Sequence, residues 1–299
     1  MGDTLSRGNL FPPVVVDEIF SKVKGKSSLA RLSGAEPVPF NGETVFTFSL
    51  DNEVDLVAEN GAKSNGGATI TPVTIIPQKV EYGFRVSDEF RYASEEKRVQ
   101  TIKAFTDGFA RKVARGLDIM AFHGVNPRTG NAAAVLNDKN FDDLITNIVT
   151  YDVGIPQDNI TAAIAMIGDE IDVNGLAISP AMKTALAALK TAENSNVPLF
   201  PNLGWGSTLT ELNGLPTDAN TTVSFRGNAD RAIVGNFADY FKWGFAKEIP
   251  MEMIEYGDPD NSGYDLKGHN QVYLRCEAYI GWGILDKDAF AIVKAGASA

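Results

Sequence analysis

Residues 43–76, ETVFTFSLDNEVDLVAENGAKSNGGATITPVTII, decide how this chain is organised. In the first arm, Phe46, Phe48 and Leu50 recur at a period of two, which places them on one face of a strand. The return arm, residues 69–76, is rich in β-branched side chains, which favour strands. The pattern predicts a long two-stranded β-ribbon.

The tip of this ribbon, residues 51–67, is acidic and rich in glycine. At about 3.3 Å per residue, the ribbon would extend on the order of 40 Å from its base. An isolated two-stranded ribbon is barely stable in water, so the chain must lay it against another surface. We expect that surface to belong to a second copy of the same chain.

Length and composition are those of a folded soluble protein. The chain has 299 residues, of which 44% are hydrophobic and 22% charged, enough for one large domain or two smaller ones. It holds no apolar run long enough to span a membrane and no export signal, so we expect no membrane partner. The single cysteine, Cys276, excludes an intramolecular disulfide framework, and its apolar neighbours predict a buried strand residue.

The net charge of −11 restricts the partners that the chain can bind. Tight binding to nucleic acid without sequence preference needs lysine and arginine facing phosphates, and here 27 such residues stand against 38 acidic ones. This balance argues against adhesion to DNA, although it does not exclude that DNA lies nearby. An acidic surface would keep neighbouring DNA from sticking.

The strongest helical pattern extends from Ser94 to His123. Ser94 is a favourable N-cap, and apolar residues follow at spacings of three and four. At about 1.5 Å per residue the helix would be about 45 Å long, which spans a domain and predicts an internal spine. The residues of the apolar stripe are Val99, Ile102, Phe105, Phe109, Val113, Leu117 and Met120.

The remaining elements follow from shorter patterns of the same kind. The expected helices are Val14–Lys24, Asp158–Gly168 and Pro180–Lys190, the last of them capped by Ser179. Residues 28–40 are expected to be extended. The expected strands are Gln78–Ser87, Gly175–Ser179, Thr221–Phe225, Ala232–Val234, Phe237–Phe245, Ile249–Tyr256, Gln271–Ala278 and Phe290–Lys294.

Residues that could carry catalysis or hold a metal ion are scarce. The two histidines, His123 and His269, have no Cys or His neighbour at ligand spacing, and His123 is interpreted as a cap of the spine helix. No set of nucleophile, base and acid can be assembled from the sequence. The sequence therefore predicts no catalytic residue, no cofactor and no metal site, and a protein that is not an enzyme.

One acidic segment, Asp258–Gly263, begins like a calcium loop. It has side-chain oxygens at positions one, three and five and a glycine at position six. The glutamate expected at position twelve is replaced by His269, and no helix pattern flanks the segment. We therefore interpret it as a hairpin turn.

Several short stretches follow one another in an order that is familiar from one protein family. Leu10–Pro13 matches the end of that family's N-terminal arm, and Val57–Gly61 matches its ribbon tip. Glu211–Pro216 is similar to an LxGxP stretch, Ala232–Tyr240 to a GDFxxY strand, and Val272–Glu277 to a terminal strand. The chain resembles the major capsid proteins of tailed bacteriophages, whose fold is shared by encapsulin nanocompartments and the floor of herpesvirus capsids.

The resemblance implies an α+β protein with the phage major-capsid fold. Because the chain starts almost directly at the arm, it also implies either a separate scaffolding protein or a sequence numbered after processing, and Met1 favours the former. The implied parts are an N-terminal arm and lead-in (residues 1–40), an extended β-ribbon loop (41–77), a peripheral domain (78–140 and 246–299) with the spine helix (94–123), and an axial α/β domain (141–245).

The function implied by the resemblance is self-assembly into the hexamers and pentamers of an icosahedral shell around packaged double-stranded DNA. The expected partners are further copies of the chain, a scaffolding protein, a portal and a possible decoration protein, with DNA enclosed but not read by sequence. The expected location is the virion, assembled in the host cell cytoplasm. Two alternatives stay open, namely an encapsulin-like protein compartment and a structural module of a phage tail or baseplate.

Two sets of residues are expected to form contacts between copies. The apolar face of the ribbon offers Phe46 and Phe48, which a neighbouring subunit could cover. The acidic tip, with Glu53 and Asp55, is expected to dock against a basic patch on the spine helix of a neighbour. The basic residues of that patch are Arg111, Lys112 and Arg115.

Some members of the resembled family join neighbouring subunits by an isopeptide bond, in which a ribbon lysine attacks an asparagine with help from a glutamate. By position, the resemblance implies Lys63, Asn270 and Glu277 for these roles. Asn270 and Glu277 are seven residues apart, so an ideal strand would direct them to opposite faces. The alternative interpretation is that Lys63 is solvated and Asn270 is a turn residue.

Overall fold

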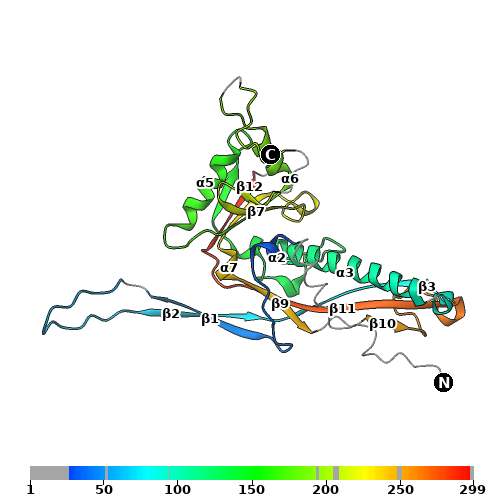
Figure 1. Cartoon of the computed structure of the whole chain (residues 1–299). Coiled ribbons are helices and arrows are strands. Elements are labelled where there is room, and N and C mark those ends of the chain that lie inside the picture. The colour runs from blue at the N-terminus through cyan, green and yellow to red at the C-terminus, as the bar shows by residue number, and fades with distance from the viewer. Residues whose placement is uncertain are drawn as a thin grey trace.

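The computed structural model of this chain describes residues 27–50, 53–93, 95–192, 195–204, 209–247 and 251–296. Figure 1 shows a protruding two-stranded ribbon, a long helix beside a four-stranded sheet, and a six-stranded sheet that carries further helices. This mixture of helices and sheets confirms the predicted α+β class. The predicted arm, the helix predicted at Val14–Lys24 and the predicted N-cap Ser94 lie outside the described residues.

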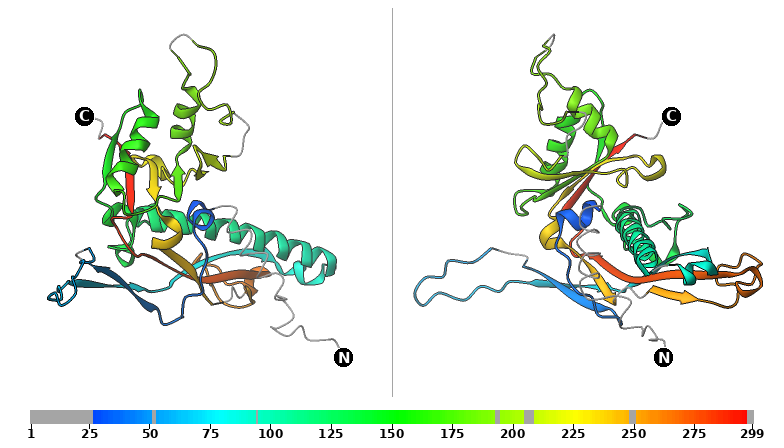
Figure 2. Two further views of the ribbon diagram at one scale, coloured as in Figure 1. Left: turned by 60° about the vertical axis from the view of Figure 1, so that its left-hand side comes forward. Right: turned by 45° about the vertical axis from the view of Figure 1, so that its right-hand side comes forward.

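The ribbon consists of β1 (Glu43–Leu50) and β2 (Ala68–Ile75), which pair antiparallel. The register places Phe48 opposite Ile70, and residues directly opposite each other share one face of the ribbon. Figures 1 and 2 show the ribbon extending away from the rest of the molecule. The predicted ribbon is confirmed.

The ribbon is anchored to the body at the end of its return strand. Ile75 is fully buried and packs against the backbone of β11 (Gln271–Ile284). The space for its side chain exists because Gly281 and Gly283 carry no Cβ; one added at Gly283 would lie 2.8 Å from Ile75 Cγ1. These two glycines therefore fix the place where the ribbon leaves the body.

β11 is the central strand of the four-stranded sheet. It pairs antiparallel with β3 (Gln78–Ser87) on one side, and with β10 (Met251–Ile254) and β9 (Phe241–Lys247) on the other. Cys276 is buried on β11, where desolvation raises the pKa of its thiol to about 12. The prediction of a buried strand cysteine is confirmed.

α3 (Glu95–His123) is the predicted spine helix and lies along this sheet, with Phe105 against aromatic rings of β3. Several of its side chains are buried from Phe109 onward, whereas Val99 near its start is 57% exposed. The spine is therefore internal only over its later turns. No helix among the described residues combines the length and apolar character needed to cross a membrane.

The second sheet has six strands in the order β4-β12-β8-β5-β7-β6. α5 (Pro156–Ile167) and α6 (Pro180–Ala188) pack against it through their apolar residues. Ser179 caps α6 by accepting a hydrogen bond from the backbone N–H of Met182, as the sequence predicts. The strands are β4 (Ile148–Tyr151), β5 (Gly175–Ile178), β6 (Glu211–Leu212), β7 (Leu215–Ala219), β8 (Asp230–Gly235) and β12 (Phe290–Ala295).

The last strand does not follow the division of the chain that the resemblance implies. Residues 246–299 are expected in the peripheral domain, but β12 pairs with β4 and β8 in the six-stranded sheet. The reason is packing, because Ala291 and Val293 are fully buried in the apolar layer shared with α5. Conversely, β9 pairs with β11, although residues 241–245 are expected in the axial domain. The domain boundaries themselves stay a prediction.

The chain is helical at α2 (Ser28–Leu32), where the sequence predicts an extended segment. The cause is Asp118 of α3, a fully buried carboxylate that accepts hydrogen bonds from the first two backbone N–H groups of α2 at 2.9 and 3.2 Å. It also accepts from the hydroxyls of Ser27 and Thr222. A negative charge stabilises a helix N-terminus, and this one lies 90 residues away, where local patterns cannot reveal it.

Two other predicted strands are wrong over part or all of their length. Residues 221–225 form a turn, because Thr222 uses both its hydroxyl and its carbonyl in bonds to side chains of α3. Residues 237–245 begin as the helix α7 (Phe237–Tyr240), which Asn236 caps, before β9 starts. The remaining short segments are α4 (Phe141–Leu144) and the 3₁₀ turns Asp88–Tyr92, Ala134–Leu136, Phe225–Gly227 and Lys267–His269.

Gly283→Ala is expected to destabilise the subunit at the root of the ribbon. The added Cβ would overlap the buried Ile75, and overpacking of this kind costs about 1–3 kcal/mol in the free energy of unfolding. Gly108→Ala is the matched control, because nothing lies near its Cβ position and an alanine in a helix is favoured by about 1 kcal/mol. Denaturant unfolding of the unassembled chain checks both variants, and equal effects would contradict the packing role of Gly283.

Asp118 is expected to make stability depend on pH. Burial raises the pKa of its carboxyl from 3.8 to about 6, against hydrogen bonds that lower it. A native pKa above the unfolded one means that stability falls as pH rises from about 4 to about 6, by about 3 kcal/mol. Asp118→Asn does not titrate, so its deficit in unfolding free energy relative to wild type should be largest near pH 4 and narrow toward pH 7. A deficit that grows with pH would refute this.

Candidate assembly surface

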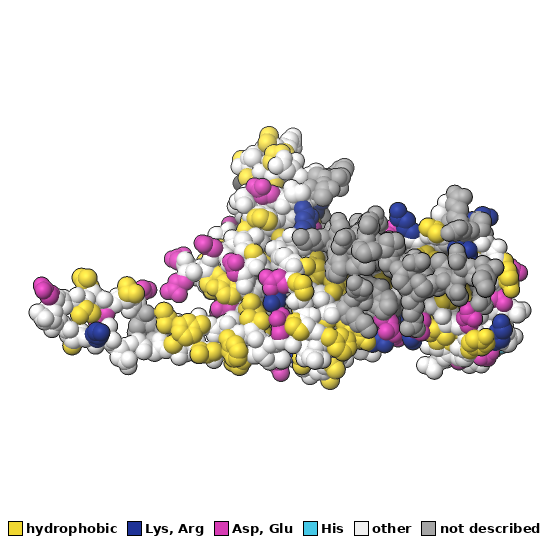
Figure 3. All heavy atoms as spheres, turned by 60° about the horizontal axis from the view of Figure 1, so that its bottom comes forward, with side chains coloured by type: hydrophobic (Ala, Val, Ile, Leu, Met, Phe, Trp, Pro, Cys, Tyr) yellow, Lys and Arg dark blue, Asp and Glu magenta, His cyan; other side chains and the backbone are white. Residues whose placement is uncertain are grey.

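One face of the ribbon consists of large apolar side chains that are open to solvent. In β1, Phe46, Phe48 and Leu50 are 66%, 62% and 70% exposed. Ile70, opposite Phe48 in β2, is 59% exposed. Figure 3 shows hydrophobic side chains gathered along the ribbon. A contiguous exposed apolar surface marks an interaction site in a soluble protein.

The opposite face of the ribbon behaves differently. Val45 and Val73 are half-buried there, and Ile75 is completely buried at the root. The ribbon thus has an inner face that the body covers toward its base, and an outer apolar face that no described part of the chain covers. The outer face is therefore available to another molecule.

The tip of the ribbon presents the predicted acidic residues at its surface. Glu53 and Asp55 are exposed. Val54 and Leu56 beside them are 96% and 98% exposed, which is unusual for apolar side chains in a soluble protein. The described tip therefore favours a partner surface that has basic and apolar groups side by side.

The predicted basic patch on α3 is present in part. Arg111 and Lys112 are exposed. Arg115 is half-buried, donates to the hydroxyl of Thr221 at 2.6 Å and lies over the ring of Phe225. The ribbon leads away from α3 of its own chain, so its tip can meet such a patch only on another copy (Figure 1). The contact stays a prediction, with Arg111 and Lys112 as its better-placed partners.

The three residues implied for an isopeptide bond lie at distant places in one chain. Lys63 is exposed on the ribbon tip, and Asn270 is an exposed turn residue with a left-handed backbone at φ 51°. Glu277 lies on β11, where its carboxylate contacts Lys79 Nζ at 2.7 Å and Arg275 Nε at 3.2 Å. A bond among them would need a second copy and a rearrangement of Glu277, and it stays a prediction.

The acidic turn at Asp258–Gly263 is organised by an arginine. The guanidinium of Arg85 on β3 donates to the carboxylates of Asp258 and Asp260 at 2.6 and 2.5 Å, and to the carbonyl of Tyr264 at 2.8 Å. Its hydrogen bonds hold the pKa of Asp260 well below the usual range. Arg85 therefore supplies the positive charge that these oxygens require. This agrees with the interpretation of the segment as a hairpin turn.

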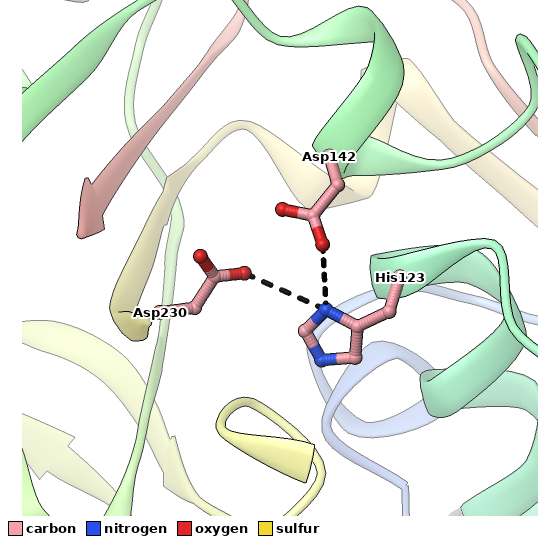
Figure 4. Close-up of side chains that lie close together, drawn as sticks. All are labelled: His123, Asp142 and Asp230. Atoms are coloured by element: carbon pink, nitrogen blue, oxygen red, sulfur yellow. Dashed lines mark hydrogen bonds and ion pairs between the residues drawn. The ribbon is translucent and has the colours of Figure 1, made fainter. Parts of the chain in front are cut away.

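A second polar feature is a cluster of ionisable side chains where α3, α4 and β8 meet (Figure 4). His123 Nδ1 lies 2.8 Å from Asp142 Oδ2 and 3.6 Å from Asp230 Oδ2. Lys294 of β12 places its Nζ 2.5 Å from Asp142 Oδ1 and 3.5 Å from Asp230 Oδ1. The cluster joins the end of the spine helix to two strands of the six-stranded sheet.

The two carboxylates of the cluster differ in the direction in which their pKa values are shifted. Burial would lower the pKa of His123, but the hydrogen bond and charge of Asp142, the Thr222 carbonyl and the charge of Asp230 together outweigh burial and raise that pKa. Burial would raise the pKa of Asp142, but His123 and Lys294 outweigh it and lower that pKa. Burial, reinforced by the nearby charge of Asp142, raises the pKa of Asp230. Asp230 is therefore the carboxylate whose charge the cluster stabilises least.

The sequence does not reveal this cluster, because no local spacing connects its members. The only signal is that His123 ends the predicted spine helix and that Asp230 stands just before the predicted strand Ala232–Val234. Such positions say that a polar side chain lies at the end of an element. They do not say which ends meet in the fold.

Comparison with known proteins agrees with this architecture. The family model of the phage capsid family matches residues 7–295. A solved chain from Mycobacterium phage Ogopogo is 32% identical and has a TM-score of 0.76, covering 91% of this chain and 92% of that chain. No curated protein sequence matches the chain.

Solved structures of lower identity share the fold alone. A chain from Gordonia phage Cozz has a TM-score of 0.74 at 22% identity, over 91% of this chain and 87% of that chain. A chain from the capsid of an empty GTA particle, computed with C5 symmetry, has a TM-score of 0.65 at 15% identity, over 91% and 90%. The predicted resemblance and fold are confirmed, and the chain belongs to the phage capsid family.

Proposed function

We propose that this chain is a major capsid protein that assembles into the hexamers and pentamers of an icosahedral shell around packaged double-stranded DNA. Its family, which consists of structural capsid proteins and is not an enzyme class, supports the proposal. The observation that carries it is the open apolar face of the ribbon, which a single copy leaves in water. The C5 symmetry of the related GTA particle supports a fivefold arrangement of such chains.

The ribbon supplies the contact between copies in this proposal. Laid over the body of a neighbour, its four exposed apolar side chains leave water, and each contributes up to about 1.5–3 kcal/mol before the cost of ordering. Because the ribbon is anchored at its root, it can cross to a neighbour without disturbing the core of its own subunit. Stable assemblies bury more than about 1,000 Å² per contact, which a ribbon of this length can reach.

Charge adds to the apolar contact between copies. It also determines how strongly the shell interacts with the DNA that it encloses. The acidic tip docks against Arg111 and Lys112 of a neighbour, which fixes the register of the apolar face. A subunit with a net charge of −11 encloses DNA without adhering to it or reading its sequence. A scaffolding protein, a portal and a possible decoration protein complete the particle, which assembles in the host cytoplasm.

Electron microscopy of the expressed chain, alone and with its scaffolding protein, tests the proposal against its two rivals. Closed angular shells support it, whereas rings or tubes would indicate a tail or baseplate module. An encapsulin-like compartment would form closed shells as well. The content of purified particles separates these two functions, because a capsid holds DNA and a compartment holds a cargo protein.

Phe46→Ser with Phe48→Ser is expected to abolish assembly while the subunit stays folded, because both side chains are exposed in the single copy. Phe46→Leu with Phe48→Leu is the matched control and should assemble, since it keeps the face apolar. Particle yield by sedimentation and folding by circular dichroism check both variants. Normal particle yield from the serine variant would remove the ribbon face from the assembly contact.

Glu53→Lys with Asp55→Lys is expected to reduce particle yield at least about tenfold at low salt, because two attractive contacts of about 1 kcal/mol each become repulsive. Adding Arg111→Glu and Lys112→Glu to the same chain should restore yield, since the contact regains opposite charges. Sedimentation at low and high salt measures both. Failure of the second pair to rescue the first would place the docking site of the tip elsewhere.

A further inference from the structure

We infer that His123, Asp142 and Asp230 bind one divalent transition-metal ion of the Zn²⁺ class at the junction of α3, α4 and β8 (Figure 4). One imidazole nitrogen and one oxygen from each carboxylate lie within 4.8 Å of one another. All three ligands of such a site come from one chain, and none of them belongs to the residues that we propose for contacts between copies. It goes beyond the proposed function and does not rest on it.

The spacing of the three ligand atoms is close to what a tetrahedral ion requires. Bonds of about 2.0–2.2 Å to nitrogen and oxygen place neighbouring ligands roughly 3.4 Å apart. Here the distances from His123 Nδ1 are 2.8 Å to Asp142 and 3.6 Å to Asp230. Adjustments of about half an ångström would bring each carboxylate oxygen to this spacing from the imidazole nitrogen, with the fourth position left for water.

Asp230 is the strongest evidence for a missing cation. Its side chain is fully buried, neither carboxylate oxygen has a hydrogen-bond partner among the described residues, and Lys294 Nζ reaches Oδ1 only as an ion pair at 3.5 Å. A buried carboxylate without donors is costly, and native proteins rarely keep one. One of its oxygens points toward His123 in Figure 4, where a metal ion would bind it.

The surroundings of the cluster resemble the outer shell of a metal site. His123 Nε2 lies 2.8 Å from the carbonyl of Thr222, which can only accept, so this nitrogen carries a proton. Nδ1 lies 2.8 Å from Asp142 Oδ2 and 2.9 Å from the amide nitrogen of Asn228, and it would give up its own proton to bind an ion. The amide of Asn228 donates to Asp142 Oδ2 at 3.1 Å and holds that carboxylate in place. Hydrogen bonds of both kinds orient metal ligands in known sites.

Charge and ligand type indicate which ion fits. A neutral imidazole and two carboxylates supply two negative charges, which match a divalent cation. One nitrogen and few oxygens suit Zn²⁺ better than Ca²⁺, which takes six to eight oxygens, or Mg²⁺, which takes an octahedron of oxygens.

Lys294 is the cation that competes for the same oxygens. Its ammonium contacts both carboxylates, yet its side chain is 23% exposed and long enough to turn toward solvent. In the ion-free protein, Lys294 therefore partly compensates the carboxylates. When an ion enters, the ammonium leaves them and the ion takes its place.

The test measures zinc binding to the full-length chain, together with thermal unfolding. We expect one Zn²⁺ per chain by metal analysis after gel filtration, and a melting temperature that rises by several degrees with Zn²⁺ but not with Mg²⁺ or Ca²⁺. Lys294→Met should bind Zn²⁺ roughly tenfold more tightly, because no ion pair has to break first. A purely structural ion cluster would show neither effect.

The two histidines of the chain provide a matched pair of controls. His123→Gln should lose the bound zinc, whereas His269→Gln should retain it, since His269 is exposed and bonded to the carbonyl of Asp265. Asp230→Asn should lose it as well. Absence of stoichiometric zinc from both wild type and Lys294→Met, or zinc retained by the folded His123→Gln chain, would overturn the inference.

Discussion

A two-stranded ribbon has two faces, and the body of this subunit covers only one of them. The inner face is buried where Ile75 packs into the space left by Gly281 and Gly283 on β11. The outer face keeps Phe46 and Phe48 in water, although such side chains are normally among the most buried. One chain alone cannot resolve this asymmetry, because the ribbon leads away from its own body. The chain belongs to the capsid family, and we propose that further copies supply the missing surface.

Inside the subunit, the later turns of α3 hold both α2 and the turn before β8 in place. Asp118 accepts hydrogen bonds from the first backbone N–H groups of α2 and from the hydroxyl of Thr222. About one turn later in α3, His123 forms a hydrogen bond to the carbonyl of the same threonine. The helix thus holds the turn that precedes β8 at two points, and Asp230 follows a few residues later. Buried carboxylates are expensive to desolvate, so they persist where hydrogen bonds or cations compensate them. The interior of the subunit is therefore specified by polar contacts as well as by its apolar layers.

The sequence predicts the features that are determined within one segment of the chain. It misses the features that depend on contacts between distant segments. The ribbon, β3, α3 and the capped helix α6 follow from periodicity and caps within one segment, and all were predictable. The helix α2 could not be predicted in this way, because the carboxylate that stabilises its N-terminus comes from α3. The open ribbon face follows from the alternation of Phe46 and Phe48, whereas the cluster around Asp230 depends on four elements that only the fold brings together. Local sequence patterns carry no information about contacts between distant elements.

The same distinction separates the residues that hold one subunit together from the residues that we assign to assembly. The residues that hold the body together, such as Asp118 and Ile75, are buried and make their contacts within one chain. The residues that we assign to contacts between copies, such as Phe48 and Glu53, are exposed and contribute little to the fold of their own chain. Because the two sets are almost disjoint, the surface can change without loss of the core. Association then becomes a property of the outer ribbon face and tip, adjustable in strength by single side chains that the folded monomer does not need.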